Sequence, residues 1–294
     1  MRKPYAMPQR RRGSLERPGC RLYYEVTGQG RPLVFLHGLG GNHASWWQQV
    51  ATFAAGYTCV TFAHRGFAPS SRIDGGPDPG DYADDLAALI DHLELTEVCV
   101  VAQSMGGWSA IEYALRPSAR LSALVLAATT GSVDPARLGE GRRLGEAQRA
   151  RLRQWQAVSE KARQDHQRRG IHVACGERMA IEQPALHFLY RQIDDMNAAL
   201  DKEALRARLV ARRRRGPEDL AAVAWPTLCI AGDEDIVMPP FAADALAAAL
   251  PRAQAAHIAD AGHSAYFERA QVFNRLLQAF LDACGLTAAP QAYA

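Results

Sequence analysis

Short apolar runs alternate along the chain with longer stretches in which apolar residues recur at helical spacing. Two of the longer stretches, Asp81–Leu95 and Phe267–Leu281, repeat apolar residues every three or four positions. The alternation predicts an open, mostly parallel α/β sheet covered by helices, with functional residues at the carboxyl ends of the strands. Seven runs have the length of strands, and most lack the polar alternation of a half-exposed sheet: Leu22–Val26, Leu33–His37, Cys59–Ala63, Val98–Gln103, Ala123–Ala127, Thr227–Ala231 and Ala255–Ala259.

The alternation stops between residues 132 and 222. This segment is rich in Arg, Glu, Gln and Ala, and it contains almost no run with the character of a strand. Structureless connections rarely exceed about 12–15 residues, so the segment is predicted to be a helical insertion between two strands, here called the cap. Pro226 marks the return to the sheet. The predicted core therefore comprises residues 19–131 and 223–285, followed by a flexible tail over residues 286–294.

The first 18 residues carry six basic residues and one acidic residue. A secretory signal needs an apolar segment of about 7–15 residues after its basic start, and none follows here. We therefore expect residues 1–18 to be a disordered basic leader. Every apolar run also falls short of the roughly 18 residues that a membrane span requires. The six cysteines lack the close pairing of zinc or redox sites, which favours a reducing, cytoplasmic location.

Composition narrows the classes of function. Hydrophobic residues make up 48% of the 294, enough for a sizeable core, and the net charge of only +3 argues against a dedicated nucleic-acid binder. The charge is unevenly distributed. Residues 132–220 carry 19 basic and 13 acidic residues, a net of +6, and residues 1–18 carry a net of +5, while the rest carries −8. A basic cap would steer anionic substrates toward a site beneath it.

The sharpest chemical signal is the sequence AQSMGG at residues 102–107, which joins an apolar run to a helical one. A serine at such a tight strand-to-helix turn is lifted above the sheet edge and lies at a helix N-terminus, where backbone N–H groups favour developing negative charge. The turn needs small neighbours, and Ala102 and Gly106 meet that demand. A serine among small residues can also be a simple helix N-cap. The strand–turn–helix context favours Ser104 as a nucleophile.

A serine nucleophile needs a base, and the base needs an orienting carboxylate. The sequence AGDEDIV at residues 231–237 closes one apolar run, and DAGH at residues 260–263 follows the next. His263 is the predicted base and Asp235 the predicted acid, in the chain order Ser, Asp, His. Asp233 also lies at the strand end and stays open as the alternative acid.

A glycine-rich loop, HGLGG at residues 37–41, follows another apolar run. Glycines let the backbone turn sharply and bring an N–H group close to a bound oxyanion. The N–H groups of Leu39 and Met105 are therefore the predicted oxyanion hole, and His37 is expected to be structural. Such a loop also fits phosphate binding, but this one lacks the Lys-Ser/Thr ending of a P-loop and a complete dinucleotide fingerprint.

With these motifs, the chain from about Cys20 to Leu281 resembles an α/β-hydrolase-fold serine hydrolase. The sequence FAHRGFAPS at residues 62–70 resembles the family's Asp-x-Arg-Gly-x-Gly-x-Ser stretch, with Ala63 in place of the usual Asp and Ala68 in place of the usual Gly. The missing Asp puts a structural hydrogen-bond network in doubt. The resemblance implies an eight-stranded sheet and a cap that forms a lid over Ser104. A serine at the elbow argues against the dehalogenases and epoxide hydrolases of this fold, which use Asp there.

The resemblance implies hydrolysis of a small to medium carboxylic ester, lactone or thioester through an acyl-enzyme on Ser104. The alternatives are a C–C bond hydrolase of the meta-cleavage type and a cofactor-free haloperoxidase, followed by a lyase or a non-catalytic ligand receptor. No cofactor or metal is expected, because the remaining histidines lack metal-ligand spacing. Trp155, Phe188 and Tyr190 of the cap either line an acyl pocket or form the cap's own small core. The expected partner is a small ester-like molecule, and the protein is expected to be a monomer or homodimer.

Overall fold

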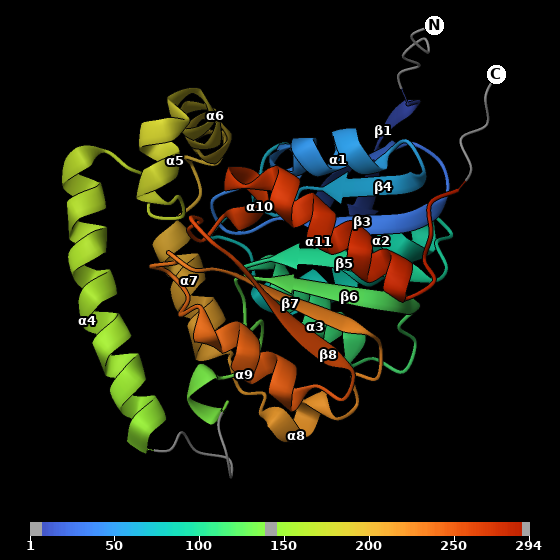
Figure 1. Cartoon of the computed structure of the whole chain (residues 1–294). Coiled ribbons are helices and arrows are strands. Elements are labelled where there is room, and N and C mark those ends of the chain that lie inside the picture. The colour runs from blue at the N-terminus through green and yellow to red at the C-terminus, as the bar shows by residue number, and fades with distance from the viewer. Residues whose placement is uncertain (1–7, 139–145, 290–294) are drawn as a thin grey trace, which may run out of the picture.

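The computed structural model describes residues 8–138 and 146–289, and its centre is one eight-stranded sheet (Figure 1). The strand order is β1-β2-β4-β3-β5-β6-β7-β8, in which β3 to β8 run parallel and β2 runs antiparallel to both of its neighbours, β1 and β4. The sheet confirms the predicted fold class. The strands are β1 (Arg10–Arg17), β2 (Cys20–Thr27), β3 (Arg31–Leu36), β4 (Tyr57–Phe62), β5 (Val98–Gln103), β6 (Leu121–Ala127), β7 (Thr227–Gly232) and β8 (Ala253–Ile258).

Helices cover both faces of the sheet, which explains why the central strands read as unbroken apolar runs. On one face, α2 (Tyr82–His92), α3 (Gly106–Ala114) and α9 (Phe241–Ala249) pack against one set of strand side chains. On the other face, α1 (Trp47–Phe53) and α11 (Ala270–Ala283) pack against the second set. Every residue of β5 and β7 is buried, as expected for strands covered on both sides.

The expectation of a disordered leader is wrong for Arg10–Arg17, which forms β1, whereas residues 1–7 lie outside the described residues. The strand pairs with β2 along its whole length, and every second residue from Gly13 onward is partly buried. Arg10 donates to Glu25 of β2 at 2.6 and 2.8 Å, and Arg17 pairs with Asp85 at 3.1 Å, so two of the arginines that suggested a solvated tail hold β1 to its neighbours. Because this stretch is so basic, the alternation of partly buried and exposed residues along β1 could not be recognised in the sequence.

The segment between β6 and β7 contributes five helices within the described residues, at the end of the sheet where the parallel strands finish (Figure 1). They are α4 (Glu146–Arg169), α5 (Glu177–Glu182), α6 (Pro184–Asp195), α7 (Lys202–Ala211) and α8 (Pro217–Leu220). The boundaries proposed for the cap stay a prediction. Within residues 8–138 and 146–289, no helix combines the length and the apolar character that crossing a membrane requires.

Two further expectations change near the C-terminus. The predicted helix Phe267–Leu281 is divided at Arg269, so that a short helix, α10 (Ala265–Glu268), precedes α11. The tail is not free at its start, because Leu286 is buried and its carbonyl accepts a hydrogen bond from the Tyr57 hydroxyl at 2.9 Å. Residues 290–294 of the predicted tail lie outside the described residues.

Candidate active site

Ser104 occupies a strained turn between β5 and α3. Its φ of +50° lies in the left-handed region, which residues other than glycine rarely adopt and which costs on the order of 1–3 kcal/mol. The turn is held by the Ser104 N–H, which donates to Ala127 O at 2.9 Å, and by the Thr129 hydroxyl, which donates to Ser104 O at 2.7 Å. A Cβ on Gly106 would lie 2.5 Å from the backbone oxygen of Leu36, so only glycine fits there. These contacts explain the small residue at that position.

Three side chains from three separate loops meet at this turn. His263 Nε2 lies 2.9 Å from Ser104 Oγ, and His263 Nδ1 lies 2.8 Å from Asp235 Oδ2. The side chains of His263 and Asp235 are only 4% and 1% exposed, so the pair is shielded from water. Asp235 Oδ1 accepts from the N–H groups of Val237 at 2.7 Å and Met238 at 2.9 Å, which leaves Oδ2 for the histidine. The structure thus brings together the nucleophile, base and acid that the motifs predicted.

The alternative acid, Asp233, points elsewhere. Its carboxylate pairs with His257 Nδ1 at 2.9 Å, and the opposite ring nitrogen of His257 lies 3.1 Å from Asp244. Asp233 is half exposed, and its only described side-chain partner is this surface histidine. Of the two carboxylates at the end of β7, only Asp235 contacts His263 within the described residues.

The glycine-rich loop lies beside Ser104, and its Leu39 packs with the apolar cluster that contains Met105. Within the described residues, the backbone N–H groups of Leu39, which is partly buried, and of Met105, which is buried, donate no hydrogen bond. Two unpaired donors in the loops that adjoin Ser104 are candidates for binding an anionic oxygen. A Cβ on Gly40 would lie 3.0 Å from the Tyr190 hydroxyl, which shows how closely the cap covers this loop.

Two buried histidines lie behind the site. His37 Nδ1 donates to its neighbour's carbonyl, Gly38 O, at 2.8 Å, and His37 Nε2 accepts from the His64 N–H at 3.0 Å. Burial lowers the pKa of His37 to about 3, and burial also lowers the pKa of His64, so both rings are neutral. His64 reaches onward to Ser109 Oγ at 2.9 Å. The expectation that His37 is structural agrees with these contacts.

The stretch that departs from the family pattern keeps a hydrogen-bond network. The Ser70 hydroxyl donates to Ala63 O at 2.7 Å and accepts from the Tyr23 N–H at 2.8 Å. The Arg65 guanidinium forms two bonds of 2.6 Å with Asp85, whose side chain is fully buried. Ala63 therefore replaces Asp without leaving the loop unsupported.

The three aromatic residues predicted for the cap pocket have different environments. The Trp155 Nε1–H donates to Asp235 O at 3.2 Å, which ties α4 to the loop of the acid. Tyr190 is buried, and its hydroxyl accepts a hydrogen bond of 3.0 Å from Ser264, the residue after the base. Phe188 of α6 is 63% exposed, so it does not form a buried core of the cap, and its place in an acyl pocket stays a prediction.

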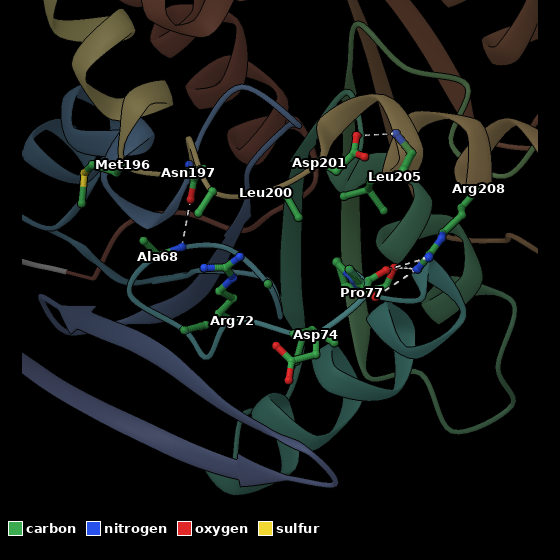
Figure 2. A pocket seen from close by; sticks show the side chains of 17 residues that line it. Ala68, Arg72, Asp74, Pro77, Met196, Asn197, Leu200, Asp201, Leu205 and Arg208 are labelled. Atoms are coloured by element: carbon green, nitrogen blue, oxygen red, sulfur yellow. Dashed lines mark hydrogen bonds between the residues drawn. The ribbon is translucent and has the colours of Figure 1, made fainter.

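A cavity of about 430 Å³ separates the loop that follows β4 from the cap segment Met196–Arg208 (Figure 2). Asn197 lines the cavity and joins two loops, because its amide accepts from the N–H of residue 68 at 2.8 Å and donates to the carbonyl of residue 41 at 3.1 Å. Arg208 fixes the wall by donating to the carbonyls of residues 75–77. Arg72 also lines the cavity and forms no ion pair within the described residues.

Three positioning contacts were missed by the motif analysis. The Gln103 amide donates to His263 O at 3.1 Å, Asn197 holds the glycine-rich loop, and Glu268 accepts backbone N–H groups on both sides of His263. Only Glu268 had a signal in the sequence, as a carboxylate inside the apolar stretch that follows the base. No group of three or more His, Cys, Asp or Glu side chains suited to holding a metal occurs within the ranges that the structure describes.

Comparison with known proteins places the chain in one family. The model of the alpha/beta hydrolase fold matches residues 31–270. The chain is 32% identical over 271 residues to BpoC of Mycobacterium tuberculosis, whose name places it among the non-heme bromoperoxidases, and the match covers 88% of this chain and 97% of that one.

Two solved structures share the fold along nearly their whole length. A bromoperoxidase from Bacillus anthracis superposes with a TM-score of 0.71 at 25% identity, covering 93% of this chain and 100% of its own. Est816, described as an N-acyl homoserine lactone degrading enzyme, superposes with a TM-score of 0.71 at 26% identity, covering 91% and 100%.

Proposed function

Because this chain belongs to the α/β hydrolase fold family, we propose that it is a serine hydrolase that cleaves a small to medium carboxylic ester, lactone or thioester. The observation that carries the proposal is the pair of hydrogen bonds from Ser104 through His263 to Asp235, of 2.9 and 2.8 Å. The similarity to a lactone-degrading enzyme supports the choice of an acyl-transfer substrate.

The proposed reaction passes through an acyl-enzyme. His263 Nε2 removes the proton as Ser104 Oγ attacks the substrate carbonyl, and Asp235 stabilises the imidazolium that forms. The N–H groups of Leu39 and Met105 bind the tetrahedral oxyanion, each contributing roughly 3 kcal/mol of transition-state stabilisation. His263 then gives its proton to the leaving group. Water repeats the sequence on the acyl-enzyme, releasing the acid and restoring Ser104.

The test is covalent labelling by a fluorophosphonate probe, together with hydrolysis of a panel of p-nitrophenyl esters, lactones and thioesters. We expect the wild type to be labelled by the probe and to hydrolyse at least one substrate of the panel. Ser104→Ala should show neither labelling nor hydrolysis. Ser122→Ala is the matched control, since the Ser122 hydroxyl donates to Glu97 O at 2.7 Å near the start of β6, at the opposite end of the strands from the turn at Ser104. Labelling that persists in Ser104→Ala would refute the assignment of the nucleophile.

A second candidate is a perhydrolase, favoured by the relatives that are named bromoperoxidases. Hydrogen peroxide would replace water in the attack on the acyl-enzyme, giving a peroxy acid and free Ser104. The peroxy acid would then oxidise bromide to hypobromous acid and return as the carboxylate. Bromination that requires hydrogen peroxide, a carboxylic acid and an intact Ser104 would favour this candidate. Bromination that continues in Ser104→Ala would exclude it.

A further inference from the structure

A carboxylate that the proposed mechanism does not use lies buried beside the base. Glu268 ends α10, five residues after His263, and is only 3% exposed. Its Oε2 accepts from the N–H groups of Gly262 at 2.9 Å and Gly176 at 3.1 Å, and its Oε1 accepts from the Ser264 N–H at 3.2 Å. Two of these donors flank His263, and the third belongs to the cap.

The backbone around this carboxylate is built for close approach. A Cβ on Gly262 would lie 2.5 Å from Gly176 N, and a Cβ on Gly176 would lie 2.7 Å from Glu268 Oε2. Both positions therefore need glycine, because a side chain at either one would push apart the two backbone segments that contain Gly176 and Gly262. Their contact is what lets an N–H group from the core and one from the cap reach the same oxygen atom.

Among the described residues, Glu268 has no cationic partner. The titratable groups that face it are Asp235 from the loop after β7, Cys175 from the cap, and Tyr266 from its own helix, and it forms no ion pair within the described residues. Burial raises the pKa of Glu268 to about 7, with Asp235 adding to the rise and the three N–H groups opposing it. The ionised form is therefore stabilised by backbone donors alone.

A neutral side chain cannot serve these donors equally well. A carboxylate offers about four lone-pair sites on two oxygens, so it can accept all three hydrogen bonds. A glutamine has only one acceptor oxygen, and its NH₂ group would point hydrogens at backbone N–H groups that are themselves donors. Charge-assisted hydrogen bonds are also roughly twice as strong as neutral ones. Protonation of either oxygen would weaken the contacts on that side in the same way.

We propose that ionised Glu268 is a positioning residue, which fixes the backbone on both sides of His263, ties it to the cap at Gly176, and so holds the imidazole between Ser104 and Asp235. The inference rests on the proposed function. Errors of about 1 Å in the placement of a base cost on the order of a hundredfold in rate. The role is thus one of geometry, since Glu268 does not touch the reacting atoms.

The first experiment compares Glu268→Gln with the wild type in hydrolysis of p-nitrophenyl butyrate. We expect kcat to fall by about 10- to 100-fold while KM changes less than threefold. Below neutral pH, the wild type should lose kcat more steeply than the variant, because only the wild type has a carboxylate at position 268 that can be protonated. Glu182→Gln is the matched control, because Glu182 is a half-exposed residue of the cap that pairs with Arg269 at 2.9 Å. A kcat within twofold of the wild type, or identical acid limbs in the two proteins, would overturn the proposal.

The second experiment needs neither a variant nor activity. In the wild type, the ¹³C shift of the Glu268 carboxyl carbon and the amide shifts of Gly176 and Gly262 should titrate with one common midpoint near neutral pH. Amide shifts of Gly176 and Gly262 that do not follow the carboxyl carbon through its titration would overturn the proposal. If the wild type is not labelled by a fluorophosphonate, the proposed function fails while this titration still reports on the contact between cap and core.

Discussion

Asp235→Asn is the substitution that most directly tests how the three loops cooperate. Asp235 Oδ1 is committed to the N–H groups of Val237 and Met238, so an asparagine would keep its oxygen there and turn its NH₂ group toward His263. Two donors would then meet at 2.8 Å unless the imidazole moves its proton from Nδ1 to Nε2. In that tautomer Nε2 carries a hydrogen and cannot accept the proton of Ser104.

The size of the effect follows from the burial of the pair. Water cannot replace the lost carboxylate, because the Asp235 side chain is 1% exposed and that of His263 is 4% exposed. The wrong tautomer of a triad histidine costs about 10⁴-fold in kcat, which corresponds to about 5.5 kcal/mol of transition-state stabilisation. KM should change little, since the carboxylate lies on the far side of the imidazole from the substrate.

The assay is steady-state hydrolysis of p-nitrophenyl butyrate, with the labelling rate of a fluorophosphonate as a second measure. Asp233→Asn is the matched control two residues away: it removes the contact with the exposed His257 and should leave kcat within twofold of the wild type. Retention of more than a tenth of the activity by Asp235→Asn would refute the reasoning. A larger loss in Asp233→Asn would assign the acid to the other carboxylate.

Two further predictions concern charge. Because burial lowers the pKa of His37 and His64, their contribution to the free energy of unfolding is fully present above about pH 6.5 and is lost as the pH falls toward 3. The raised pKa of Glu268 has the opposite effect, so that its contribution to the free energy of unfolding increases as the pH falls. These three groups together predict a loss of about 2 kcal/mol in the free energy of unfolding between pH 6.5 and 5. The lowered pKa values of His43, His166 and His187 add to this loss, and the raised pKa of His257 opposes it. Urea denaturation measures the change, and a free energy of unfolding that rises over this range would contradict the prediction. If the basic cap steers anions, kcat/KM for an anionic ester should fall as NaCl increases from about 0.05 to 0.5 M, while that for a neutral ester stays constant; equal responses would exclude steering.

The features that the sequence predicts well are those set by local pattern. Strands buried on both faces must be apolar throughout, and the turn at Ser104 must have small neighbours, so both leave a signature within a few residues. β1 was missed because its partly buried positions are Gly13, Leu15 and Arg17, of which only Leu15 is apolar, so its period of two leaves almost no hydrophobic signal in the sequence. The exposure of Phe188 could not be predicted, because an aromatic side chain on a cap helix can face either the core or the solvent and no local pattern decides which.

Hydrogen bonds between segments far apart in the chain could not be predicted from the sequence, and these bonds hold the cap against the loops of the candidate site. Within the described residues, the cap is bonded to the loop of the acid by Trp155 and Arg163, to the glycine-rich loop by Asn197, and to the loop of the base by Tyr190 and Gly176. Each of these five hydrogen bonds is worth about 1 kcal/mol, so breaking these five alone costs about 5 kcal/mol. Opening the whole cap at once would cost more, because the bonds of Arg208 to residues 75–77 and of Glu182 to Arg269 would break as well.

A cost of about 5 kcal/mol leaves roughly one molecule in several thousand open at any moment. Substrate access by movement of the entire cap would lower the observed association rate by the same factor. A local route avoids this cost, and the cavity between the loop after β4 and the cap segment Met196–Arg208 adjoins the glycine-rich loop through the single side chain of Asn197. Displacing that one amide breaks two hydrogen bonds to the core and leaves every contact around His263 and Asp235 in place. The same contacts that position the base therefore favour a cap that stays closed over it and admits substrate at its edge.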